Sequence, residues 1–102
     1  MHYVLLLLAG GLLCNAIPHL VSGLQGARFP TPFAKPRGVG SSSSLVNFLW
    51  GASNLLVGLV ILERRLTVIG PNLEVGAVVV GFLAIGLFAA VHFGKGRDAS
   101  TG

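Results

Sequence analysis

Three long stretches of the sequence carry no charged residue, and they constrain the fold more than any other feature. Lys, Arg, Asp and Glu are missing from residues 1–27, 38–62 and 75–94. Apolar runs within these stretches cover about residues 4–24, 45–62 and 75–93. A helix rises about 1.5 Å per residue, so roughly 20 residues cross a hydrocarbon core of about 30 Å. Each run is therefore long enough to be a transmembrane helix.

The composition supports a membrane protein over a water-soluble domain. Hydrophobic residues make up 53% of the 102-residue chain and charged residues 10%, whereas soluble domains contain about 25% charged residues. Backbone groups in lipid must pair within the segment, which favours helices, and the runs lack the alternation of a membrane β-barrel. We therefore predict an all-α integral membrane protein, a single domain over residues 1–102 with three transmembrane helices.

The connections between the runs differ in character. Residues 25–44 contain Pro30, Pro32 and Pro36, so this long first loop is not expected to be helical. Its phenylalanines favour a loop that folds back on the bilayer surface, and Ser43 or Ser44 is the predicted cap of the second helix. Gly70 and Pro71 mark a turn before the third helix. The small, polar tail 94–102 is expected to be disordered.

Basic residues predict the orientation. The first loop and the tail share one side of a three-span protein and hold five Lys and Arg residues, against two in the second connection. Cytoplasmic segments carry the excess, so we expect a multi-pass protein of the cell inner membrane, with its N-terminus outside and its C-terminus in the cytoplasm. Basic loop residues are also candidates for binding lipid headgroups: Arg28, Lys35 and Arg37.

Small and polar residues recur on one face of the second run. Asn47, Gly51, Asn54 and Gly58 are spaced at i, i+4, i+7 and i+11, which places them on one side of a helix. Small residues allow membrane helices to approach closely. The predicted helix-packing positions are Gly51, Gly58, Gly81 and Gly86. We expect these faces to contact other membrane helices, from a second copy or a larger complex, so that Asn54→Leu or Gly58→Leu disrupts assembly.

Combining the faces with the topology predicts a polar cluster at one end of the bundle. The first and third helices run in the same direction, so His19 and His92 lie at a similar depth, and the second helix brings its own start to that end. The candidate ligand site, or polar cluster, comprises Asn15, His19, Asn47, Trp50, Asn54 and His92. Polar side chains inside a membrane are costly and face the bundle interior or a cavity.

Two interpretations of this cluster remain open. The plainer one is hydrogen bonding between helices. In the other, His19 and His92 bind haem b, a quinone head group or a metal ion, or relay protons. No cofactor is predicted under the first interpretation. No phosphate-binding or hydrolytic motif and no basic patch with aromatic residues is present, so we identify no catalytic residue, favour a non-enzymatic role and expect no nucleic-acid partner.

The segment from Asn15 to Asn54 carries a resemblance. It reads NAIPHLVSGLQGARFPTPFAKP, continues through a Gly/Ser stretch and ends with VNFLWGASN. In this it resembles small multi-pass bacterial membrane proteins, and the resemblance implies no activity, cofactor or catalytic residue. The function expected from the sequence is that of an accessory, scaffold or self-assembling subunit acting by helix association, with a ligand-binding protein as the alternative.

Overall fold

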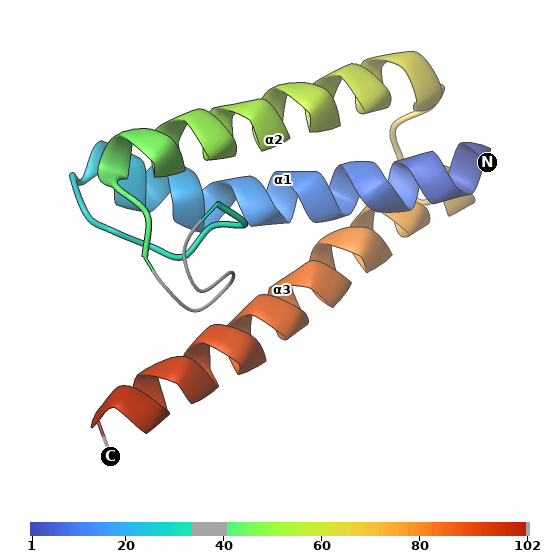
Figure 1. The fold of residues 1–102 in the computed structure, drawn as a ribbon. Helices are drawn as coiled ribbons and strands as arrows, with labels where there is room; N and C mark the ends of the chain where they lie inside the picture. The colour runs from blue at the N-terminus through green and yellow to red at the C-terminus, as the bar shows by residue number, and fades with distance from the viewer. Residues whose placement is uncertain (34–40, 102) are drawn as a thin grey trace.

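The chain forms three long helices. The computed structural model describes residues 1–33 and 41–101, with α1 at His2–Leu24, α2 at Ser44–Arg65 and α3 at Leu73–Thr101 (Figure 1). The apolar parts of these helices are 23, 22 and 23 residues long, enough to cross a membrane. The predicted all-α class with three membrane-spanning helices is therefore confirmed. Each helix begins one or two residues before its predicted span.

Helix α1 lies between the other two. Figure 1 shows α2 packed antiparallel along α1, whereas α3 runs in the direction of α1 and diverges from it toward the C-terminus. Within the described part of the chain, α2 and α3 make no contact with each other. Burial follows this arrangement, since 33% of the most apolar stretch of α1 is buried inside the protein but only 6% of that of α3. Most of α3 therefore faces the surroundings.

Side-chain caps set where α2 and α3 begin. The hydroxyl of Ser43 accepts a hydrogen bond from the backbone N–H of Val46 at 3.3 Å, which confirms one of the two predicted caps. Asn72 plays the same part for α3, because its side-chain oxygen accepts from the N–H of Val75 at 2.9 Å. Each cap satisfies a backbone donor that the first helical turn leaves without a partner.

Helix α3 continues to Thr101, into the tail 94–102 for which the composition predicts disorder. Adding a residue to an existing helix fixes little extra chain and gains one hydrogen bond, so small polar residues extend a helix that they would not start. Disorder of the tail stays a prediction.

Small residues allow α2 to pack closely against α1. The buried residues of α2 are Asn47, Gly51, Asn54 and Gly58, the face identified from their spacing. A Cβ atom at Gly51 would lie 2.8 Å from the backbone nitrogen of Leu20, and one at Gly58 would lie 3.3 Å from the carbonyl oxygen of Ala9. This face is thus covered by α1 of the same chain, and substitutions at Asn54 or Gly58 test internal packing instead of assembly.

A second glycine contact forms where α3 crosses α1. A methyl group at Gly10 would collide with the carbonyl oxygen of Val78, and one at Gly81 with that of Leu7. Beyond this point the helices separate, so that a Cβ at Gly86 would meet only the sulfur of Cys14, at an ordinary 3.4 Å. The crossing at Gly10 and Gly81 is therefore the closest backbone contact between α1 and α3 that these glycines mark.

A polar group near the crossing joins the start of α1 to the start of α3. One carboxylate oxygen of Glu74 accepts from the backbone N–H and the hydroxyl of Thr67, at 3.0 and 2.7 Å. Its other oxygen lies 2.6 Å from Nε2 of His2. These bonds hold the connection between α2 and α3 against the beginning of α1, at the opposite end of α1 from His19.

Candidate functional site

The predicted polar residues of α1 and α2 form two hydrogen-bonded pairs. In the first, which we call the His19 link, Nδ1 of His19 lies 2.7 Å from Oδ1 of Asn47. Both residues are buried, with His19 only 3% exposed and Asn47 not exposed at all. A buried polar group without a partner costs free energy, so this pairing stabilises the position of both side chains.

Asn47 also holds the first loop in place. Its side-chain nitrogen lies 2.9 to 3.2 Å from the carbonyl oxygens of Phe29, Ser42 and Ser43. Phe29 and Ser42 pair as an isolated β-bridge, with N···O distances of 3.3 and 3.0 Å. One asparagine therefore joins the end of the loop, the start of α2 and His19 of α1.

The second pair, which we call the Asn15 link, lies one helical turn away. Asn15 donates from Nδ2 to Oδ1 of Asn54 at 3.1 Å, and Asn54 donates from its own Nδ2 to the carbonyl oxygen of Trp50 at 2.8 Å. Asn15 and His19 are four residues apart, so they share one face of α1. The two links thus run in parallel from α2 to α1.

The hydrogen bonds also determine which ring nitrogen of His19 carries a proton. Because the Asn47 atom surrounded by carbonyl oxygens must be the amide nitrogen, the atom that faces His19 is the amide oxygen. That oxygen accepts, so Nδ1 of His19 donates. A neutral histidine protonated at Nδ1 has a lone pair at Nε2. His19 therefore offers a hydrogen-bond acceptor at Nε2, which bonds to no described residue.

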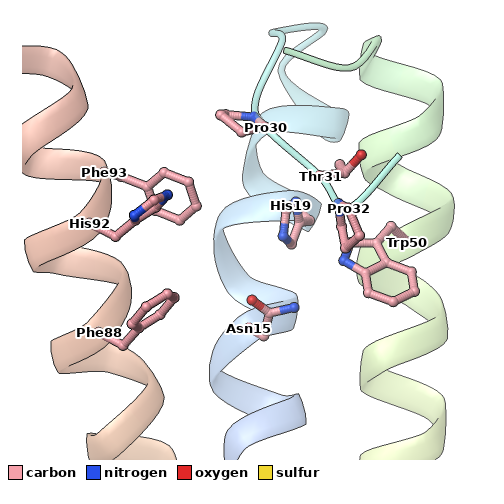
Figure 2. Close-up of a pocket in the computed structure, with 9 residues that line it drawn as sticks. All are labelled: Asn15, His19, Pro30, Thr31, Pro32, Trp50, Phe88, His92 and Phe93. Carbon is pink, nitrogen blue, oxygen red and sulfur yellow. The ribbon is translucent and has the colours of Figure 1, made fainter. Parts of the chain in front are cut away.

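Asn15 also presents a hydrogen-bond acceptor. One N–H of its amide donates to Asn54, and its oxygen accepts from no described residue. Figure 2 shows this oxygen directed toward α3 and the nitrogen directed toward α2. Both links therefore end in an acceptor on the same face of α1.

The first loop folds back between the helices, and several of its residues join the site. The hydroxyl of Thr31 lies 2.6 Å from that of Ser42 and accepts from the backbone N–H of Phe33 at 3.1 Å. Thr31 is 2% exposed, so this turn is packed inside the protein. Proline and phenylalanine in this loop predict a return toward the bilayer surface, but they do not indicate contact with His19.

Aromatic rings connect the loop to α3. Phe29 lies edge-on to the imidazole of His19, with 5.3 Å between ring centroids, and 4.7 Å from the ring of Phe93. On α3, the rings of Phe88 and His92 are stacked at 5.4 Å. These contacts place a wall of rings opposite the polar face of α1.

A cavity of about 280 Å³ lies between that wall and α1. Figure 2 shows Phe88, His92 and Phe93 extending from α3 toward α1, with α2 on the other side of α1 and the loop running down across α1. The cavity is lined by Asn15, His19, Pro30, Thr31, Pro32, Trp50, Phe88, His92 and Phe93. Among the described residues that line it there is no carboxylate, lysine or arginine, so this lining is largely apolar with a few polar groups.

The structure divides the predicted cluster into two groups. Asn15, His19, Trp50 and His92 line the cavity, whereas Asn47 and Asn54 lie behind it as the α2 partners of the two links. The predicted cluster did not include the loop residues of the lining, Phe88 or Phe93. The indole N–H of Trp50 is buried and lacks a hydrogen-bond partner among the described residues.

The residues predicted to bind lipid headgroups lie in the first loop. Arg28 donates to the hydroxyl and the carbonyl oxygen of Ser41, both at 3.2 Å, while Lys35 and Arg37 lie outside the described residues. No group of three or more His, Cys, Asp and Glu residues gathers in the described ranges to hold a metal ion. The metal interpretation therefore has two histidines and no further ligand of these types.

Comparison with known proteins adds no family to this description. No protein-family model, curated protein or solved structure matches the chain. The geometry of the cavity and its surroundings is therefore what indicates a function.

Proposed function

We propose that the protein binds a small, neutral, lipid-soluble molecule in the cavity between α1 and α3. The observation that supports this proposal is a single cavity in which apolar rings face two hydrogen-bond acceptors held in fixed orientation. Ligand sites are mostly apolar with a few placed polar groups that orient the ligand. A lipid-soluble molecule reaches a site between two membrane helices through the bilayer, without crossing water.

The size of the cavity favours a ligand with one ring. Pockets for drug-sized molecules measure about 300–1,000 Å³, and this cavity of about 280 Å³ lies just below that range. A quinone-type head matches this volume better than the macrocycle of haem b, the other cofactor considered from the sequence. His19 and His92 then act as lining residues for the head, in place of axial ligands to iron.

The single tryptophan provides a direct test, because Trp50 lines the cavity and is the only one in the chain. We expect decyl-benzoquinol, added to the protein in lipid nanodiscs, to change Trp50 fluorescence in a saturable manner. Phe88→Ala removes one ring of the wall, and since aromatic contacts contribute about 0.5–1.5 kcal/mol, affinity should fall by about 2- to 12-fold.

Phe82→Ala is the matched control, since Phe82 is on the same helix outside the cavity lining. Its affinity should equal that of the native protein. A fluorescence change that rises linearly with probe, or that is identical in both variants, would mean that the molecule only partitions into lipid.

Association with other helices is a second candidate function, favoured by the exposure of α3. Its outer face includes Val80, Leu83, Leu87 and Val91, each more than half exposed. A partner helix from a second copy or a larger complex would cover this face as an accessory or scaffold subunit requires. The glycine faces do not serve this purpose, because α1 already covers those of α2.

Light scattering in mild detergent tests association. We expect a mass greater than one chain for the native protein and a smaller mass for Leu87→Trp, because the larger ring prevents close packing on α3. Leu56→Trp on the exposed side of α2 should leave the mass unchanged. A native protein that is monomeric, or a Leu87→Trp variant of native mass, would contradict this role.

We also propose an orientation and a membrane. The excess of Lys and Arg on the side of the first loop and the tail favours a cytoplasmic location for that side, in a protein that we propose lies in the inner membrane of a bacterial cell. The cavity would then open near the cytoplasmic end of the bundle.

A further inference from the structure

We infer that the ligand of this cavity carries a hydroxyl group that donates a hydrogen bond to Nε2 of His19, as a quinol or another phenol does. This inference rests on the proposed function, because it names the class of molecule that the cavity binds. It follows from the polarity of the two links and from the absence of charge in the lining.

The His19 link and the Asn15 link determine which kind of hydrogen-bonding group the ligand must supply. Nδ1 of His19 donates to Asn47, and one N–H of Asn15 Nδ2 donates to Asn54, so the acceptors that α1 leaves for a ligand are Nε2 of His19 and Oδ1 of Asn15. Both need a donor from the ligand. A quinone has only carbonyl acceptors, so it would leave both of these acceptors without a partner. The corresponding quinol or a phenol has a hydroxyl donor and satisfies the site.

The lining disfavours donors that carry a charge. An ammonium or guanidinium group also donates, but no carboxylate is present among the described lining residues to balance it, and an unpaired charge is costly in an apolar site. A neutral hydroxyl has no such cost. Its oxygen retains acceptor capacity, which the buried and unpartnered indole N–H of Trp50 can use after a small shift of the lining.

Ring-shaped ligands are favoured by the opposite wall. The stacked rings of Phe88 and His92 and the ring of Phe93 present aromatic surfaces toward α1. An aromatic ring between this wall and the acceptors would make offset or edge contacts while directing its hydroxyl to His19. An aliphatic alcohol satisfies the acceptor but leaves the ring contacts unused.

A matched pair of probes isolates the hydroxyl. We expect para-nonylphenol to bind the protein in nanodiscs more tightly than para-nonylanisole, which has the same ring and tail but an ether that cannot donate. A hydrogen bond of ordinary net strength predicts a preference of about 2- to 12-fold. Isothermal titration calorimetry measures both affinities, with protein-free nanodiscs as the reference for partitioning.

His19→Asn tests which residue accepts. An asparagine nitrogen is bonded to Cγ as Nδ1 is in histidine, so this variant retains a donor for Asn47. Its amide oxygen takes the place of Cδ2 and does not extend as far as Nε2, so the acceptor at the Nε2 position is lost. The preference for the phenol should disappear while the anisole binds as before. In the native protein, phenol should also move the ¹⁵N resonance of His19 Nε2, and anisole should not, a measurement that does not require the variant to fold.

The outcomes separate this inference from the proposed function. Equal affinity of phenol and anisole for the native protein, or a native Nε2 resonance that phenol does not move, would overturn the hydroxyl donor and leave the cavity as a binding site. An undiminished preference in a folded His19→Asn variant would also overturn the role of His19. Saturable binding of neither probe would overturn the proposed function as well.

Discussion

Replacing Asn47 with leucine should destabilise the protein more than any other single change on α2. The variant leaves Nδ1 of His19 and three loop and helix carbonyls without their side-chain partner; two of these four bonds are buried and two are part-buried. The carbonyls keep their backbone donors, so each lost bond to them costs about 0.5–1.5 kcal/mol, whereas the buried and unsatisfied Nδ1 costs about 1–3 kcal/mol. We therefore expect a loss of about 3 kcal/mol or more in the free energy of unfolding. Titration of mixed micelles with sodium dodecyl sulfate measures it.

Asn54→Leu is the graded control for this prediction. It removes an asparagine of the same face that has one bond to Asn15 and one within its own helix. Interhelical hydrogen bonds in membranes contribute about 0.6 kcal/mol on average, so this variant should lose less than half as much stability. Equal losses, or a loss below about 1 kcal/mol for Asn47→Leu, would show that Asn47 does not organise this end of the bundle.

The second large effect is expected at the crossing of α1 and α3. Gly81→Ala places a methyl group against the backbone carbonyl of Leu7, which cannot move without displacing α1. Overpacking of this kind costs about 1–3 kcal/mol, and we expect the upper part of that range because the obstacle is backbone. We expect a lower temperature of heat-induced unfolding in detergent, and a longer distance between spin labels on α1 and α3.

Gly76→Ala is the matched control on the same helix. A Cβ at Gly76 meets nothing within 4 Å, and alanine is the better helix former by up to about 1 kcal/mol in water. Its stability should equal or exceed that of the native protein. If both variants unfold alike, the close approach at Gly81 is not what holds α3 to α1.

The sequence predicts the helices and the inward face of α2 well, because both depend on local patterns. Residue spacing alone placed Asn47, Gly51, Asn54 and Gly58 on one side of a helix, and depth alone brought His19 to the start of α2. The sequence does not predict which of these side chains form hydrogen bonds with each other. The pairing of His19 with Asn47, and not with Asn54, depends on the exact shift of α1 along α2, because the two asparagines share one face and differ only in depth. No periodicity specifies that shift.

The path of α3 and the position of the loop were not predictable for a related reason. Gly81 and Gly86 have the same small side chain, but only Gly81 lies at the backbone crossing. The crossing angle depends on the shapes of both helix surfaces together. Phe29 and Thr31 reach the site because the loop pairs with Ser42 across a segment of the chain, a long-range contact with no local signal.

The position of α1 between its two neighbours separates the functions of the helices. All hydrogen bonds of the His19 and Asn15 links lie within α1, the first loop and α2, whereas α3 supplies only the facing rings and is fixed to α1 by the glycine crossing and the Glu74 contacts at the far end. A tilt of α3 about that crossing would widen or narrow the cavity between α3 and α1. The acceptors would keep their orientation throughout, so the protein can adjust to the thickness of a ring without losing its preference for the group that the ring carries.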